Sequence, residues 1–188
     1  MGMKEGIEVP PLRRIDIRAA AVRARAVLGA GQGRIDAEHL LEKLFEFGIT
    51  VDIFDSTEAP VAANIEACFV PETSTLHVRD TAYAQMCSGH ARGIFTFGHE
   101  LGHIILAHRK TMNRVAPMPS GWLPAFSNSE WQADTFAAEF TMPLDIINTL
   151  QLFKPDAIAN QFGVSLKAAE IRLYNLRKYS ETQERKKP

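Results

Sequence analysis

Hydrophobic positions in the first part of the chain recur at helical spacing in two segments. Residues 12–28 follow the Pro10-Pro11 pair and end at the glycine-rich stretch 29–33, which predicts a first helix. A second helix is predicted after Asp36, a residue type that caps helix N-termini, and Gly48 should end it. Its apolar face should consist of Leu40, Leu41, Leu44 and Phe45.

Three short segments show spacing or composition typical of strands. Residues 49–54 alternate apolar and polar side chains. Residues 67–70 and 75–79 flank the turn-forming stretch Pro-Glu-Thr-Ser, which predicts a hairpin. We therefore expect a small, mainly antiparallel sheet.

The rest of the chain is predicted to be mostly helical. The exception is 109–127, where three prolines and a glycine predict an irregular loop. Residues 180–188 are polar and basic, and we expect them to form a flexible tail. Strands followed by a long helical stretch indicate an α+β fold.

Composition and charge narrow the class of protein. Hydrophobic residues make up 46% and charged residues 23% of 188, which excludes a wholly disordered chain or a coiled coil. A chain with a net charge of −1 lacks the overall positive field that non-specific nucleic-acid binding needs. Arg18, Arg23 and Arg25 are expected on the solvent-facing side of the first helix, with contact to an acidic partner as the alternative. Cys68 and Cys87 are too few for a disulfide scaffold. No signal peptide or apolar run of ~20 residues is visible, so we expect a cytoplasmic protein without a membrane partner.

The chemically informative stretch is HELGH at residues 99–103, an HExxH motif. Residues four apart share a helical face, so the imidazoles of His99 and His103 can reach one zinc ion at roughly 2.0–2.1 Å. Glu100 lies about 100° around the helix, where it can accept a proton from a water molecule that the metal activates. Thr96 is expected to cap this helix. The alternative is coincidence, since a shuffled chain of this composition would contain the motif about once in 70.

A third ligand is expected on a later helix, where Glu130 and Asp134 are four residues apart. A catalytic zinc has three protein ligands and an open fourth position. Glu130 could supply the third ligand, and Asp134 could accept the free N–H of His99. The alternative is a solvated acidic face, but the aromatic and alanine-rich surroundings favour burial, and a buried carboxylate needs a cation. We therefore predict one catalytic Zn²⁺ held by His99, His103 and Glu130.

Three motifs together resemble the signature of the ImmA/IrrE metallopeptidases. They are HELGHIIL at 99–106, Glu130-x-x-Ala133-Asp134-x-Phe136-Ala137-Ala138, and Met142-Pro143. The resemblance covers roughly residues 35–178. It implies a zincin-like fold and a thermolysin-like zinc endopeptidase, with Glu100 as general base and acid. Because members typically cleave a helix-turn-helix repressor, it also implies a repressor of a mobile element or stress response as the protein substrate.

The chain departs from the family pattern at a few positions. Gln132 stands where the family often has a second glutamate, and Thr141 replaces an apolar residue. His108 is nine residues from His99 and about 180° around the helix, so it is not counted as a ligand. The resemblance predicts a metallopeptidase domain over 1–150 with a helical extension over 1–34. A helical appendage over 151–179 and the tail 180–188 would follow.

The appendage itself resembles a helix-turn-helix. Gly163 is expected in the turn, and Ser165 should cap the second helix. That helix would expose Leu166, Lys167, Glu170 and Ile171, a set that is not strongly basic. We therefore favour packing of this pair on the catalytic core, with a role in gripping the substrate as a further option, over binding in a DNA groove.

Several alternatives stay open at this point. The chain could be a DNA-binding or protein-binding regulator that uses residues 155–178, with a structural or vestigial metal site. It could also be a peptidase for small peptides. A peptide substrate is expected to lie extended along the edge of the sheet. Tyr83, Tyr174 and the histidines are all candidates for stabilising the oxyanion.

Overall fold

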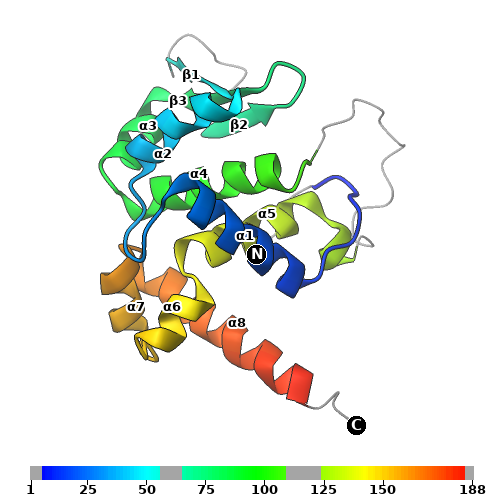
Figure 1. Cartoon of the computed structure of the whole chain (residues 1–188), viewed down its shortest axis with the longest axis vertical. Helices are drawn as coiled ribbons and strands as arrows, with labels where there is room; N and C mark the ends of the chain where they lie inside the picture. The colour runs from blue at the N-terminus through cyan, green and yellow to red at the C-terminus, as the bar shows by residue number, and fades with distance from the viewer. Residues whose placement is uncertain (1–5, 56–64, 109–123, 185–188) are drawn as a thin grey trace.

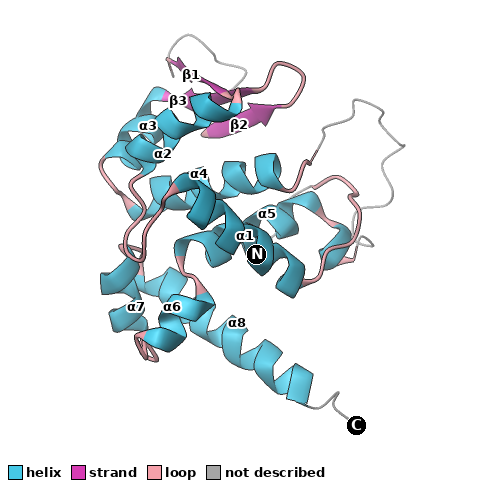
Figure 2. Ribbon diagram, viewed as in Figure 1, coloured by secondary structure: helices cyan, strands magenta, loops and turns pink. Residues whose placement is uncertain are grey.

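The computed structural model describes residues 6–55, 65–108 and 124–184 (Figure 1). The expected α+β fold is confirmed: a small sheet with α2 and α3 lies at one end, α1, α4 and α5 form the middle, and α6 to α8 lie at the other end (Figures 1 and 2). No helix within the described ranges is both long and apolar enough to cross a bilayer. The elements are α1 (Arg14–Leu28), α2 (Ala37–Leu44), η1 (Phe45–Phe47), β1 (Thr50–Phe54), β2 (Ala67–Val70), β3 (Thr75–Arg79), α3 (Asp80–Cys87), α4 (Ala91–Ile105), η3 (Ala125–Ser127), α5 (Ser129–Thr141), α6 (Leu144–Thr149), α7 (Pro155–Phe162) and α8 (Leu166–Glu184).

Helix α1 confirms the first predicted helix, but two of its arginines do not face solvent as expected. Arg25 is only 6% exposed, and its guanidinium donates to the carbonyl oxygens of Ala30 and Gly31 at 3.1 and 2.6 Å. Arg18 donates to the buried carboxylate of Glu139. The Nη1 of Arg25 also donates to the carbonyl oxygen of Phe140 in the last turn of α5. Arg25 therefore pairs with carbonyl groups of the turn after α1 and of the end of α5, which the spacing of charges along α1 cannot reveal.

The second predicted helix is also confirmed, with Asp36 as its cap. The Asp36 carboxylate accepts the backbone N–H of His39 at 3.1 Å. Phe45 was wrongly placed on the apolar face, because α2 ends at Leu44 and a 3₁₀ turn follows. Its side chain is 59% exposed.

The three predicted strands are confirmed and form a sheet in the order β1-β3-β2. β2 and β3 are antiparallel, as the hairpin requires, with Phe69 opposite Leu76. β1 pairs with β3 in parallel, with Val51 opposite Leu76. The expectation of a mainly antiparallel sheet is thus met by only one of the two pairings, since β1 joins the side of β3 that the hairpin leaves free. Within the described ranges, β2 pairs with β3 alone and is an edge strand.

Helices α4 and α5 form the centre of the molecule. Phe97 and Leu101 from α4 and Phe136 and Phe140 from α5 are 0–1% exposed and belong to the same core as the sheet. Their backbones approach closely at Gly102, where a Cβ atom would lie 3.1 Å from the Cα of Ala133. The absence of a side chain at Gly102 therefore lets α4 and α5 pack in direct contact.

The C-terminal helices have a core of their own. Its buried residues are Met142, Ile147, Ile158, Phe162, Ala169 and Leu173. The predicted helix-turn-helix geometry is observed: Gly163 adopts a φ of 68°, and the Ser165 hydroxyl accepts the N–H of Ala168 at 3.1 Å. Arg172 of α8 joins this unit to α5, since it donates to the Glu139 carboxylate at 2.8 and 2.6 Å.

The structure describes only part of the two segments that were expected to be irregular, the loop 109–127 and the tail 180–188. Helix α8 continues to Glu184, so residues 180–184 are helical where we expected a flexible tail. Residues 185–188 and the stretch 109–123 of the expected loop lie outside the described residues. The division into domains stays a prediction.

Candidate metal centre

The site is built on the facing sides of α4 and α5. Helix α4 begins at Ala91 behind the cap residue His90, so the prediction that Thr96 caps it was wrong. Thr96 lies inside the helix, and its hydroxyl donates to a carboxylate oxygen of Glu66 at 3.2 Å. Helix α5 begins after Asn128, whose side chain accepts the N–H of Trp131 at 3.0 Å.

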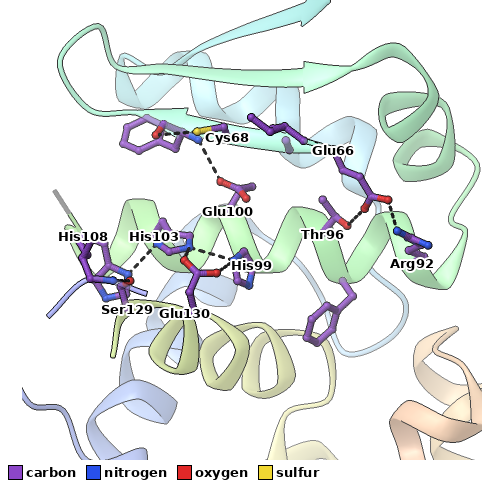
Figure 3. Close-up of a pocket in the computed structure, with 15 residues that line it drawn as sticks. Glu66, Cys68, Arg92, Thr96, His99, Glu100, His103, His108, Ser129 and Glu130 are labelled. Atoms are coloured by element: carbon purple, nitrogen blue, oxygen red, sulfur yellow. Dashed lines mark hydrogen bonds and ion pairs between the residues drawn. The ribbon is translucent and has the colours of Figure 1, made fainter. Parts of the chain in front are cut away.

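The three predicted metal ligands lie together between these helices (Figure 3). The Nε2 atoms of His99 and His103 are 3.1 Å apart. Each lies 3.4 Å from a carboxylate oxygen of Glu130. The three residues offer ligand atoms that all lie within 4.8 Å of one another.

This donor set fits a zinc ion. Ligand atoms about 2.0–2.1 Å from a tetrahedral zinc lie roughly 3.3–3.4 Å from one another, and the observed separations of 3.1 to 3.4 Å are close to that spacing. Two histidines and one glutamate are also a donor set that catalytic zinc sites use. His99, His103 and Glu130 could therefore hold one zinc ion and leave a fourth position open.

Asp134 takes the position predicted for it beside His99. Its carboxylate oxygen is 2.8 Å from the Nδ1 atom of His99. Burial lowers the pKa of His99, but the hydrogen bonds to Asp134 and Glu130 outweigh it and raise the pKa to about 9. With its Nδ1–H held by Asp134, His99 directs Nε2 toward Glu130 and His103, and this atom could bind a metal once its own proton has left.

Glu100 lies beside the three ligands and is not one of them (Figure 3). It is 8% exposed, and its Oε2 accepts the backbone N–H of Phe69 at 3.1 Å. The charge of Glu100 contributes to the raised pKa of His99, so the two groups are within electrostatic reach. This position, between the ligand cluster and strand β2, is one where a carboxylate can exchange protons with a molecule bound in the cleft.

A cleft of about 500 Å³ is lined by His99, Glu100, His103 and Glu130, whereas Asp134 is not among its lining residues. One wall is the start and edge of β2, and the other is formed by α4 and the first turn of α5. The lining residues that sequence reasoning missed are Ile7, Ile65, Glu66, Cys68, Phe69, Arg92, Phe95 and Ser129. Neither Tyr83 nor Tyr174, two candidates for stabilising an oxyanion, is among the residues that line it.

The N-terminal segment reaches this cleft by backbone pairing. The N–H of Ser129 donates to the carbonyl of Ile7 at 3.1 Å, and the N–H of Ile7 donates to the Ser129 hydroxyl at 3.1 Å. Glu8 forms an isolated antiparallel bridge with Asn128. The sequence of residues 6–12 does not predict this contact, because Ile7 takes part through its backbone groups, which every residue type offers.

His108 lies against the site although the helical spacing argued against it. Its Nδ1 atom is 3.0 Å from Nδ1 of His103. The reasoning from a 180° rotation was wrong because α4 ends at Ile105, and Ala107 then adopts a φ of 53° that turns the chain back. The conclusion that His108 is not in the ligand cluster agrees with the structure.

A comparison with protein-family models found a match over the part of the chain that contains this site. Residues 87–174 match the family model of the IrrE N-terminal-like domain, Peptidase_M78. That segment contains His99, Glu100, His103, Glu130 and Asp134. The match supports the ImmA/IrrE family.

A solved structure described as a Mycobacterium tuberculosis transcriptional regulator resembles the chain with a TM-score of 0.53 at 19% sequence identity. The alignment covers 82% of this chain and 45% of that one. The chain therefore spans less than half of that protein, and the similarity supports a shared fold. A comparison with curated proteins found no match.

Proposed function

We propose that the chain is a zinc-dependent metallo-endopeptidase of the ImmA/IrrE family that hydrolyses a peptide bond in a protein substrate. The observation that carries the proposal is the cluster of His99, His103 and Glu130 in one cleft with Glu100 beside it. The family-model match over residues 87–174 supports the same class of enzyme.

Zinc held by His99, His103 and Glu130 would supply Lewis-acid polarisation of the scissile carbonyl and of an attacking water molecule. The chain's own residues supply the rest. Glu100 accepts the proton of the attacking water and passes it to the leaving amine. The N–H of Phe69 donates to Oε2 of Glu100 and so orients the carboxylate between β2 and the ligand cluster.

Substrate binding is assigned to the edge of β2. Among the described residues this strand pairs with β3 alone, so a peptide can add to its other edge through backbone groups other than the Phe69 N–H, which donates to Glu100. Such a peptide would pass between β2 and α4, over Glu100. The family resemblance points to a helix-turn-helix repressor as the protein that contributes this peptide.

The test compares new protein N-termini, by mass spectrometry, in cells that express the wild-type chain or Glu100→Gln, with and without DNA damage. The glutamine retains an oxygen for the Phe69 N–H but cannot accept a proton. We expect a new terminus with the wild type only, and equal zinc content in both proteins because Glu100 is not a ligand. Loss of zinc in Glu100→Gln would contradict its assignment as the base.

The alternative is a DNA-binding or protein-binding regulator that uses residues 155–178. The helix-turn-helix arrangement of α7 and α8 is the observation in its favour. Leu166, Lys167, Glu170 and Ile171 are exposed at the start of α8, as a recognition helix would require. Their charges cancel, which argues against phosphate contacts. If both proteins give identical N-termini under every condition and Glu100→Gln still binds duplex DNA in a salt-sensitive manner, the regulator is correct.

A further inference from the structure

A buried chain of hydrogen bonds leads away from His103. It runs from Nδ1 of His103 to Nδ1 of His108 at 3.0 Å, and from Nε2 of His108 to Oε1 of Gln132 at 2.8 Å. His108 is 6% exposed and Gln132 1%, so neither side chain can exchange its partner for bulk water. Buried polar atoms must pair within the protein, and that requirement dictates where the protons are.

The orientation of Gln132 is determined at its far end. Its Nε2 lies 2.9 Å from the carbonyl oxygen of Pro10 and 2.7 Å from that of Phe126. Carbonyl oxygens only accept, so the side-chain atom that meets both must be the NH₂ group. The Oε1 atom therefore faces His108 and can only accept.

The proton positions of both imidazoles follow in sequence. Because Gln132 Oε1 accepts, Nε2 of His108 carries the hydrogen, and Nδ1 of a neutral His108 presents a lone pair. That lone pair faces Nδ1 of His103, which must then carry the hydrogen. The lone pair of His103 is consequently on Nε2, the atom that faces His99 and Glu130.

We propose that His108 and Gln132 are positioning residues that hold His103 in the tautomer able to bind the metal. The inference deepens the proposed function, because it concerns the same metal site. Asp134 performs this task for His99 through a carboxylate. For His103 this task falls to two uncharged side chains, His108 and Gln132, which we call the relay. The relay ends on the backbone carbonyls of Pro10, before α1, and Phe126. Partners of this kind typically account for 10–100-fold in metal affinity.

The backbone at Ala107 shows that the position of His108 is specifically maintained. Ala107 has a φ of 53°, a left-handed conformation that costs a residue other than glycine free energy. The N–H of His108 donates to the carbonyl oxygen of His103 at 3.0 Å and closes this turn. The reversal places the His108 ring against the ring of His103, with centroids 5.0 Å apart.

The first measurement determines the tautomers of His103 and His108 in the metal-free wild-type protein. Two-bond ¹H–¹⁵N spectra of the metal-free protein report which ring nitrogen carries the proton, and His103→Ala and His108→Asn assign the signals. We expect the proton of His103 on Nδ1 and that of His108 on Nε2. A proton on Nε2 of His103 would overturn the relay, whether or not the protein binds zinc.

The second measurement is zinc affinity by competition with a chelator of known affinity. His108→Phe keeps a ring of similar size without nitrogen atoms, and we expect at least tenfold weaker binding. His108→Asn places Oδ1 where Nδ1 was, so it should restore affinity to within about threefold of the wild type. His39→Phe, at an exposed histidine of α2, is the control and should not change affinity.

The outcomes separate the relay from the metal site itself. Wild-type affinity in His108→Phe, with an unchanged His103 spectrum, would refute the relay. A wild-type protein that binds zinc no better than His99→Ala would instead refute the proposed metal site, and the spectra would then decide the relay alone. A thermal melt of each variant identifies one that fails to fold.

Discussion

Substitution of Gly102 tests whether the contact between α4 and α5 sets the geometry of the metal site. Gly102 lies between the two histidines in sequence and faces α5. A Cβ atom there would lie 3.1 Å from Cα and 3.2 Å from O of Ala133, and 3.2 Å from Cβ of Phe136. Two of these atoms belong to the backbone, so α5 has to move by a few tenths of an ångström to accept Gly102→Ala.

The expected magnitude combines two opposing effects. Overpacking of this kind costs about 1–3 kcal/mol, and replacing glycine by alanine within a helix recovers up to about 1 kcal/mol. The free energy of unfolding should therefore fall by roughly 0–3 kcal/mol. Glu130 lies one turn before Ala133 on α5 and moves with it. Because metal sites tolerate displacements of only about 0.5 Å, we expect roughly tenfold weaker zinc binding, which is about 1.4 kcal/mol.

Gly98→Ala is the matched control, one turn earlier on the same helix. Its Cβ would meet Ala137 Cα and Cβ at 3.4 Å, which is ordinary contact. We expect unchanged zinc affinity and stability raised by up to about 1 kcal/mol. Chelator competition and thermal unfolding of both variants provide the comparison. Equal zinc affinity in Gly98→Ala and Gly102→Ala would refute the claim that this contact sets the ligand geometry.

Three further predictions concern the buried ion pairs and the metal. Glu139→Ala leaves Arg172 buried without its partner, so urea unfolding should show a loss of about 3–5 kcal/mol, while the exposed Arg23→Ala stays within about 0.5 kcal/mol. Burial raises the pKa of Glu139, but hydrogen bonds from Arg172 and Arg18 outweigh it and lower the pKa. That stabilisation is complete above the unfolded pKa of about 4.3 and is lost as pH falls through the folded pKa, so the stability gap between wild type and Glu139→Gln should shrink in acid. A gap that stays constant from neutral pH to about pH 3 would contradict this assignment. Zinc at 100 times its Kd should stabilise the wild type by about 2.7 kcal/mol and leave Glu130→Ala unchanged, and a wild-type melt insensitive to both zinc and chelator would argue against the site.

The parts of the fold that the sequence predicts well are those that local chemistry decides. The hairpin between β2 and β3 has its strands at the predicted residues because a four-residue turn leaves one way to pair them. Asp36 caps α2 and Ser165 caps α8 through hydrogen bonds that span three residues. The approach of His99 to His103 likewise depends only on helical spacing.

The parts that were missed depend on groups far apart in the chain. Arg25 and Arg18 look like surface charges on α1, and only the positions of distant carbonyl and carboxylate groups explain why they turn inward. The parallel pairing of β1 places Thr50 opposite Thr75, far along the chain, and no local turn specifies it. His108 was misjudged because its geometry depends on the residue where α4 ends and on the left-handed turn at Ala107.

The proposed metal ligands are divided between two helices that pack directly on each other. His99 and His103 belong to α4 and Glu130 to α5, and the two helices approach each other closely at Gly98 and Gly102. A chain opened between His108 and Pro124 would therefore carry two ligands on one fragment and the third on the other. Zinc capture would require the two fragments to associate, which would make this site a chemical reporter of fragment complementation.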